Sequence, residues 1–307
     1  MNILVTGGAG FIGSHIVDYL VEDGHKVAVL DNLSAGMEKN VNSAAMFFKA
    51  DINDVSFVNK VFSDWKPDIV YHMAAQIDVR ISMNDPVFDA DQNILGSLRL
   101  LECCKKHKVK KVIFASTGGA IYGEQEYYPA NENHPVNPVS PYGIAKLTVE
   151  KYLYYYKVQY GLSYVSLRYA NVYGPRQNSK GEAGVVAIFA QKLLNKEPAV
   201  INGDGKQTRD FVFVHDIAKY NRLAIQHDIE GIFNIGTGVE TTVNEIYTEI
   251  AAAAGIDTPP QHAKAIPGEQ ERSSINGDRA VVRFGVKPEV SVSEGIENTV
   301  QWFKLNR

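Results

Sequence analysis

The stretch Thr6-Gly7-Gly8-Ala9-Gly10-Phe11-Ile12-Gly13 decides the fold of this chain. It joins a short β-branched run to an amphipathic run, so it lies between a predicted strand and a predicted helix. Gly7, Gly10 and Gly13 give the spacing G-x-x-G-x-x-G, and a second register, G-x-G-x-x-G, starts one residue later. A pyrophosphate binds the backbone N–H groups at a helix N-terminus, where side chains would block its approach. The loop therefore predicts a dinucleotide site, with a ligand-free glycine turn as the alternative.

A carboxylate ends the next predicted strand. Asp31 follows the glycine loop at close to the spacing of about 20 residues at which dinucleotide folds place an acid on the adenosine ribose. Such an acid repels a 2′-phosphate, and the residues after it, Asn32-Leu33-Ser34, include no arginine. The pattern favours NAD over NADP, although Asp31 as a loop acid or helix cap is the alternative. Asp51-Ile52, after the third strand, is a weaker candidate for the adenine edge, and a simple cap explains Asp51 equally well.

Strands and helices alternate through the first half of the chain. The predicted strands are Ile3–Thr6, Lys26–Asp31, Met46–Lys49, Ile69–His72, Val112–Ser116 and Tyr164–Arg168, and the predicted helices are Ile12–Glu22, Val55–Trp65, Val87–His107 and Ser140–Tyr160. Continuous apolar strands between helices indicate an α/β protein with a doubly wound parallel sheet of the Rossmann type, covered on both faces.

The pattern changes after Asn171, where proline, glycine and polar residues cluster. We expect residues 1–172 to form the dinucleotide-binding domain, together with a returning segment at about 211–236. We expect residues 173–307 to form mainly a smaller α/β substrate lobe. Its predicted elements are the helices Val185–Asn195, Val243–Ala254 and Ser293–Leu305 and strands near Val200, Phe211–Val214 and Gly231–Asn234.

The composition excludes several classes of protein. Of 307 residues, 45% are hydrophobic and 21% charged, as in globular proteins, and the net charge of −4 weighs against nucleic-acid binding. Cys103 and Cys104 are adjacent and form no disulfide framework. No apolar run approaches the roughly 18 residues of a membrane span. The start, MNILVTGGAG, has no basic region before its glycines. We therefore expect a cytoplasmic protein without a membrane partner. The spacing of the histidines predicts no metal site. We expect His72, at the end of a predicted strand, to have a structural role.

A tyrosine and a lysine share one face of the predicted helix Ser140–Tyr160. Tyr142 and Lys146 stand at i and i+4, and Ser116-Thr117 ends the fifth strand, where open α/β sheets place ligand groups. A phenol has a pKa of about 10, so a base near neutral pH needs a shift of about three units. The ammonium and a positive nicotinamide ring would stabilise the phenolate. The combination predicts an acid–base site; an incidental Tyr and Lys on a surface helix is the alternative.

The chain resembles the extended short-chain dehydrogenase/reductase family. The residues that carry the resemblance are Thr6–Gly13, Asp31-Asn32, Asn93, Ser116-Thr117 and Tyr142-x-x-x-Lys146. Three later segments, Arg168–Arg176, Gly203–Asp210 and Phe233–Gly238, make the chain similar over nearly its whole length to the UDP-sugar 4-epimerases of that family. The resemblance implies reversible C4 epimerisation of a UDP-hexose (UDP-glucose and UDP-galactose) through a 4-keto sugar, with NAD as cofactor.

The resemblance also implies residue roles. Tyr142 would be the catalytic base and Lys146 its partner, which also grips the nicotinamide ribose, while Thr117, with Ser116 beside it, would bond the sugar 4-oxygen. The remaining cofactor contacts implied are Gly7, Gly10, Phe11, Ile12, Gly13, Asp31, Asn32, Asp51, Ile52, Ala74, Asn93 and Tyr169. The substrate contacts implied are Thr117, Asn171, Val185, Arg209, Arg272 and Ser273, with Asn171 and Arg209 on the diphosphate. A salt bridge to Asp210 or another acid is the alternative for Arg209.

The chain departs from its relatives at three places. Counted back from Tyr122, the position of the usual Ser or Thr is Gly118, so the choice between Ser116 and Thr117 is open and we favour Thr117. Ile266 stands where relatives carry a basic residue that binds the diphosphate. Either Arg272 takes over the role of that basic residue, or the diphosphate is held more weakly. Ser273 stands where a bulky tyrosine excludes N-acetyl groups, so UDP-GlcNAc and UDP-GalNAc are further predicted substrates.

Relatives dimerise through the helices matched by Val87–His107 and Ser140–Tyr160, so we expect a homodimer. Other chemistries of the family need residues that differ here. A dehydratase or decarboxylase needs acids where Gly119-Ala120 stand, and a UDP-glucuronate 4-epimerase favours an arginine where Asn178 stands. The alternatives kept are such an epimerase or reductase of the same family and a nucleotide-sensing protein without catalysis.

Overall fold

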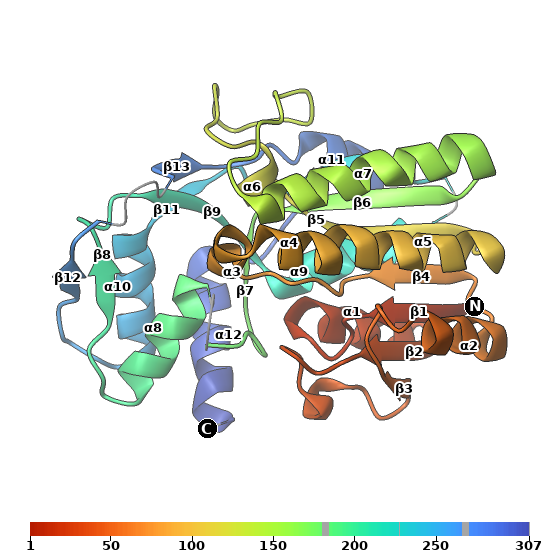
Figure 1. The fold of residues 1–307 in the computed structure, drawn as a ribbon. Coiled ribbons are helices and arrows are strands. Elements are labelled where there is room, and N and C mark those ends of the chain that lie inside the picture. The colour runs from red at the N-terminus through yellow and green to blue at the C-terminus, as the bar shows by residue number, and fades with distance from the viewer. Residues whose placement is uncertain (180–183, 227, 266–269, 307) are drawn as a thin grey trace.

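The main sheet has the predicted topology. The computed structural model describes residues 1–179, 184–226, 228–265 and 270–306, and in this part of the chain seven strands form a sheet in the order β10-β6-β5-β4-β1-β2-β3 (Figure 1). All of its pairings are parallel. The strands are β1 (Asn2–Thr6), β2 (Lys26–Asp31), β3 (Met46–Lys49), β4 (Ile69–His72), β5 (Lys111–Thr117), β6 (Ser163–Tyr169) and β10 (Gly231–Ile235). The chain reverses direction across the sheet between β1 and β4, and ligands bind at such a switch point.

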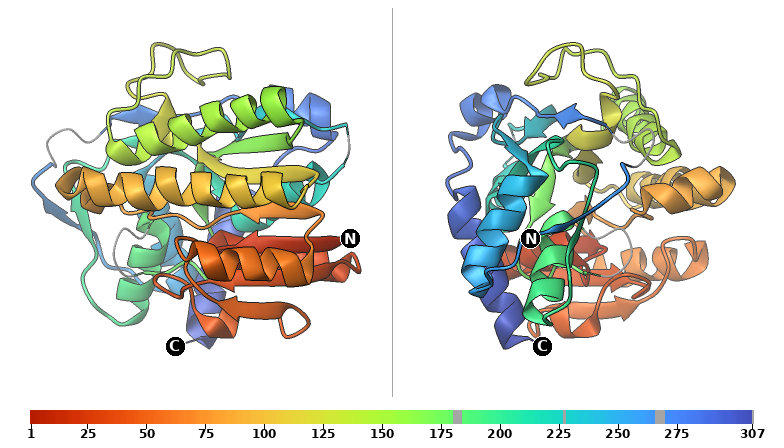
Figure 2. Two further views of the ribbon diagram at one scale, coloured as in Figure 1. Left: turned by 45° about the vertical axis from the view of Figure 1, so that its right-hand side comes forward. Right: turned by 90° about the vertical axis from the view of Figure 1, so that its left-hand side faces the viewer.

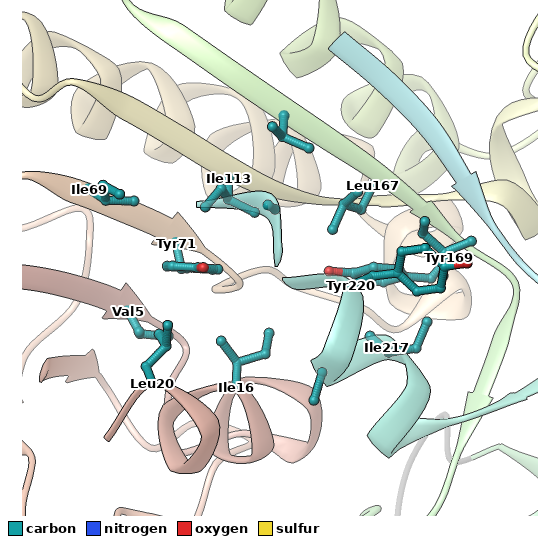
Figure 3. Close-up of a cluster of buried hydrophobic side chains, with 14 of the residues drawn as sticks. Val5, Ile16, Leu20, Ile69, Tyr71, Ile113, Leu167, Tyr169, Ile217 and Tyr220 are labelled. Carbon is teal, nitrogen blue, oxygen red and sulfur yellow. The ribbon is translucent and has the colours of Figure 1, made fainter. Parts of the chain in front are cut away.

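Helices cover both faces of this sheet because strand side chains alternate between them. Ile3 and Val5 point into one core cluster and Leu4 into another. The first cluster includes side chains of α1 (Phe11–Glu22), α9 (Val214–Ala224) and α11 (Asp278–Phe284), and the second those of α2 (Val55–Trp65), α5 (Gly96–Lys106) and α7 (Pro141–Tyr160). Figure 3 shows the first cluster, where Ile16 and Leu20 of α1 meet the sheet. The predicted doubly wound α/β fold is confirmed.

Local signals fix the helix that carries the candidate pair. Ser140 caps α7, since its Oγ accepts a hydrogen bond from the Gly143 N–H at 3.2 Å, and Pro141 fills the first position. Gly161 ends the helix with φ +71°.

The single long helix expected over Val87–His107 is interrupted. The structure has α4 (Pro86–Ala90), a π-helical turn η2 (Asp91–Leu95) and then α5. Asp85 starts α4 by accepting a hydrogen bond from the Phe88 N–H at 2.9 Å. The π turn contains the buried Asn93, and such turns often mark functional sites. A short helix α3 (Val79–Asn84) precedes α4.

The second half of the chain builds a smaller lobe at the carboxyl ends of the main strands (Figures 1 and 2). Its central strand is β9 (Thr208–Phe213), which pairs with β7 (Asn171–Tyr173), β11 (Glu240–Thr242) and β13 (Arg272–Ser273). The strands β8 (Val200–Asn202) and β12 (Gln261–Ala263) form a separate pair. The helices α8 (Val185–Leu194), α10 (Val243–Ala254) and α12 (Val292–Leu305) pack a third core.

The chain returns from the lobe to the main sheet through α9 and β10. α9 packs in the same core cluster as α1, and β10 joins the sheet beside β6. β9 belongs to the lobe, so the return begins at Val214. The division of the chain at residue 172 stays a prediction. Within the described ranges, no helix combines the length and apolar character that a membrane crossing requires.

Candidate active site

The glycine loop packs so closely that side chains have no room. Gly7 has φ +70°, and a Cβ there would lie 2.6 Å from the backbone N of Ala74. A Cβ on Gly13 would lie 2.2 Å from the Gly7 carbonyl oxygen. Gly10 caps α1 and Phe11 and Ile12 form its first turn, so the first-turn N–H groups face the loop without a capping side chain. This cradle has the form that a pyrophosphate needs.

Asp31 holds the glycine loop from the end of β2. Its side chain is buried, and its two oxygens accept hydrogen bonds from the Ala9 N–H at 3.0 Å and the Leu33 N–H at 2.8 Å. Each carboxylate oxygen keeps a lone pair, which suits it to accept a ribose hydroxyl. A loop acid and a ribose acceptor are therefore compatible roles for this residue. The cradle and this carboxylate together fit the adenosine and pyrophosphate half of NAD.

The loops after β2 and β3 are tied together. Asn32 Nδ2 donates to Asp51 at 2.8 Å, and the other Asp51 oxygen accepts the Asn53 N–H. The helix α2 is capped by Asp54 and not by Asp51, so the capping alternative for Asp51 is wrong. Ile52 is buried behind this loop.

The loop after β4 is braced by buried side chains. Asn93 Oδ1 accepts the Gln76 N–H, and Asn93 Nδ2 donates to the Gln76 carbonyl and to Asp89 Oδ1, all at 2.8 Å. The side chain of Asn93 is thus engaged with the loop that carries Ala74. His72 lies behind the loop, bonded to Thr6 and Ser97, and burial lowers its pKa to about 3. His72 is a structural residue, as expected.

Tyr142 and Lys146 lie together at the end of β5. The Lys146 Nζ is 5.7 Å from the Tyr142 ring centroid and donates to the Ala115 carbonyl at 2.8 Å. Burial lowers the pKa of Lys146 to about 8, although Asp89 and Glu150 act in the opposite direction. Burial also raises the pKa of Tyr142, and Asp89 adds to this effect. The protein's own groups therefore move the phenol pKa upward, opposite to the direction that a base requires.

The two hydroxyls at the end of β5 have different surroundings. Ser116 is buried, and its Oγ donates to Glu150 Oε1 at 2.7 Å. Thr117 lies on the opposite side of the strand and is partly exposed. A Cβ on Gly119 would lie 3.9 Å from Thr117 Oγ1 and 3.6 Å from Asn171 Oδ1, so these two side chains flank the same glycine. This geometry favours Thr117 over Ser116 as the group available to a ligand.

A buried ion pair that the sequence did not predict lies behind the site. Glu150 follows Lys146 by one helical turn and pairs with Arg168 at 2.6 Å, and both are buried. Arg168 Nη1 also donates to the Tyr122 hydroxyl, which donates to Asn234. This network links α7 to β5, β6 and β10. Its only sequence signal is the i, i+4, i+8 series Tyr142, Lys146, Glu150.

Tyr169 is buried, and its predicted contact with the cofactor stays a prediction. Its hydroxyl donates to Asn221 Oδ1 at 3.1 Å, and its ring belongs to the core cluster of Figure 3. In the sheet register it pairs with Thr117, so its backbone borders the site.

The lobe brings most of the predicted substrate residues onto one small sheet. Arg209 on β9 is in register with Ser273 on β13, and Asn171 starts the neighbouring strand β7. Val185 is the first residue of α8. Asp210 accepts hydrogen bonds from Thr237, Gly238 and Ile275 and lies on the other side of β9 from Arg209, so Asp210 is not the partner of Arg209. Arg209 Nη1 donates to the Thr208 carbonyl at 2.8 Å, and a salt bridge of Arg209 to another acid stays an alternative.

Arg272 and Ser273 have opposite surroundings. Ser273 is buried, whereas Arg272 is exposed. The Arg272 Nε donates to Glu240 at 3.0 Å, and its guanidinium lies 4.0 Å from the Tyr128 ring centroid. Its role on a diphosphate therefore requires release from Glu240. Ile266, which stands where relatives carry a basic residue, lies outside the described residues. Within the described ranges, His, Cys, Asp and Glu form no cluster of three that could hold a metal ion.

Known proteins match the chain over its whole length. A model of the NAD dependent epimerase/dehydratase family matches residues 3–236. The UDP-glucose 4-epimerase of Mycolicibacterium smegmatis is 44% identical over 310 aligned residues, 99% of each chain.

Two solved structures superpose closely. The UDP-glucose 4-epimerase of Thermotoga maritima, solved with UDP-glucose, has a TM-score of 0.97 at 48% identity and covers 100% of this chain and 99% of its own. The UDP-N-acetylglucosamine 4-epimerase of Methanobrevibacter ruminantium, in complex with UDP-N-acetylmuramic acid, has a TM-score of 0.94 at 38% identity, with 100% and 99% covered. The chain therefore belongs to the NAD dependent epimerase/dehydratase family, the extended short-chain dehydrogenase/reductases that its sequence resembles.

Proposed function

We propose that this chain is an NAD-dependent 4-epimerase that interconverts UDP-glucose and UDP-galactose. The observation that carries the proposal is the placement of Tyr142 and Lys146 beside Thr117 at the end of β5, next to the glycine cradle. The similar enzymes of Mycolicibacterium smegmatis and Thermotoga maritima support UDP-glucose as a substrate.

The residues of the main sheet would hold NAD along its length. The glycine cradle would bind the pyrophosphate, Asp31 the adenosine ribose, and Lys146 the nicotinamide ribose. Asn93 acts through the loop that it braces rather than by direct contact. Bound NAD supplies a reversible hydride acceptor, which allows the sugar to pass through a 4-ketone.

The chain's own residues handle the proton. Tyr142 takes the proton of the sugar 4-hydroxyl and returns it to the 4-oxygen of the product. Because burial raises the pKa of Tyr142, positive charge must offset that effect. The Lys146 ammonium supplies one such charge and the oxidised nicotinamide ring a second. Thr117 holds the 4-oxygen while the charge on it changes.

The lobe would hold the UDP part and leave the sugar loosely bound. Arg209 offers a planar guanidinium that suits paired phosphate oxygens, with Asn171 nearby. The ketone must present its opposite face before it is reduced, so binding through UDP allows the sugar to turn without release.

Ser273 extends the proposal to N-acetylated sugars. Its small, buried side chain leaves more room than a tyrosine at the same position. The similar protein of Methanobrevibacter ruminantium is a UDP-N-acetylglucosamine 4-epimerase, which supports this extension. An enzyme active on UDP-glucose but inactive on UDP-GlcNAc and UDP-GalNAc would contradict it.

We also propose a homodimer in the cytoplasm. Large apolar side chains are exposed on both of the helices expected at the dimer contact: Val87 on α4 at 77%, and Tyr154 and Val158 on α7 at 60% and 59%. A dimer would cover such side chains. A sedimentation experiment that gives the mass of one chain at micromolar concentration would contradict the dimer.

The direct test of the function is a panel of nucleotide sugars. The purified protein is denatured, its bound nucleotide is identified by mass, and native protein is then incubated with each sugar. We expect NAD to be released and UDP-glucose and UDP-galactose to interconvert without added cofactor. A protein that binds NAD but converts none of the sugars would favour the nucleotide-sensing alternative.

A further inference from the structure

Asp89 on α4 is a buried carboxylate that the proposed mechanism does not use. It is 1% exposed, and its Oδ1 accepts hydrogen bonds from Asn93 at 2.8 Å and from the Gln76 side chain at 3.0 Å. Among the described residues, its Oδ2 has no hydrogen-bond partner. A buried charge with an unpartnered oxygen is unfavourable, so a role for the charge itself must be sought.

The packing of α4 against α7 places this carboxylate near the catalytic pair. α4 packs against α3, η2 and α7. On α3, Arg80 is exposed, and on η2, Asp91 pairs with Arg99 at 3.1 Å. On α7, Glu150 pairs with Arg168. Tyr142 and Lys146 are also on α7, and Asp89 interacts electrostatically with both.

We propose that Asp89 is a positioning residue of this site: one oxygen fixes the loop that borders the cofactor, and the negative charge keeps the Lys146 ammonium protonated beside Tyr142. The inference rests on the proposed function. Fixing the loop does not require a charge, because an asparagine could accept the same two hydrogen bonds through its Oδ1. The carboxylate is therefore explained by its effect on the pair.

The effect of the charge has a definite sign. A negative charge raises the pKa of a nearby ammonium and of a nearby phenol. Its removal lowers both, so the pH at which Tyr142 becomes a base and the pH at which Lys146 loses its proton move in the same direction. If Asp89 only held the loop, its replacement would lower the rate at every pH and leave the pKa values of Tyr142 and Lys146 unchanged.

The first test is the pH profile of kcat/KM for Asp89→Asn. We expect both limbs of the profile to move to lower pH, by roughly one unit. Gln76→Ala is the matched control, since it removes one hydrogen bond to the same oxygen and keeps the charge. We expect it to lower the rate without moving the limbs. Limbs of Asp89→Asn that coincide with those of the wild type would overturn the proposal.

The second test reads stability and does not depend on activity. Burial raises the pKa of Asp89 in the folded protein, so the cost of its charge to folding is full above that pKa and disappears only as the pH falls below the ordinary carboxyl value. We therefore expect Asp89→Asn to melt higher than the wild type at pH 7, by about 2 °C. The difference should shrink as the pH falls towards 4. A lower melting temperature at pH 7 would overturn the proposal, because it would show the carboxylate to be a stabilising brace.

If Asp89→Asn does not fold, a different variant tests whether the charge of Asp89 interacts with Lys146. Lys146→Met leaves the carboxylate without its cation. We expect its loss of melting temperature to be larger at pH 7 than at pH 5, and an equal loss at both would overturn the proposal. A wild-type protein that converts no UDP-sugar would instead refute the proposed function. The stability measurements would still show whether Asp89 is charged in the folded protein and interacts with Lys146.

Discussion

The two halves of the site are built differently. In the main sheet the candidate cofactor residues are fixed by buried hydrogen bonds: Asp31 holds the glycine loop and Asn93 holds the loop after β4. In the lobe the candidate substrate residues stand on the short strands β7, β9 and β13, and Arg209 and Asn171 keep part of their surface in solvent. A rigid half suits a cofactor that stays bound, whereas a looser half suits a sugar that must turn over between two reactions.

The largest expected effect lies at the junction of the halves. Tyr142→Phe removes the proposed base and should lower kcat by about 10²-fold to 10⁴-fold. Tyr152→Phe, at an exposed position of the same helix, is the control and should behave as the wild type. Epimer formation by NMR gives the rates, and melting curves show that both variants are folded. Activity of Tyr142→Phe near that of the wild type would show that Tyr142 is not the catalytic base.

The rigid half is tested by Gly7→Ala. Its positive φ and the 2.6 Å approach to Ala74 predict a displaced loop and loss of bound NAD. Gly24→Ala is the matched control, since Gly24 has φ +75° but no atom within 4 Å of the added Cβ. It should lose about 1 kcal/mol of stability and keep its NAD. Equal NAD content in the two variants, measured by mass, would mean that the loop is not a cradle.

The looser half is tested at two arginines. Arg209→Ala should raise KM for UDP-glucose by about 10-fold to 100-fold, because a charged hydrogen-bonding partner of the diphosphate is lost. Arg272→Ala should change KM by less than about twofold, since its guanidinium pairs with Glu240 in an exposed position. A larger effect at Arg272 than at Arg209 would reverse the assignment of the diphosphate site.

The smallest expected effect is the change of kcat/KM with pH in the wild-type enzyme. Because the pKa of Lys146 is lowered to about 8, the ammonium is lost as the pH rises through that value, and kcat/KM should fall above it. Lys146→Arg keeps a positive charge, so the fall should move to higher pH. A fall at the same pH in Lys146→Arg would point to a different titrating group.

The same contrast explains what the sequence could predict. The glycine loop, Asp31 and the cap of α7 are local patterns, and the structure has the strands and helices that they indicate. The π turn at Asn93 was not predicted, and its side chain makes hydrogen bonds to Gln76, which lies 17 positions away in the sequence. The pairing of Glu150 with Arg168 depends in the same way on how α7 packs against β6.

The residues of the lobe were predicted only through the family resemblance. Arg209, Ser273 and Asn171 come from three separate segments, and only the register of β7, β9 and β13 brings them together. The exposed pair of Arg272 with Glu240 joins β13 to β11 and has no sequence signal. The direction of the Tyr142 pKa also depends on burial, which spacing along a helix does not reveal.

The proposed epimerisation requires that hydrogen leaves C4 of the sugar and returns to the same carbon within one binding event. The measurement is the conversion of UDP-glucose carrying deuterium at C4, by the protein as isolated and without added NAD. We expect UDP-galactose that retains the deuterium at C4. Product that has exchanged this deuterium with water would contradict it, since the hydrogen would then have left as a proton.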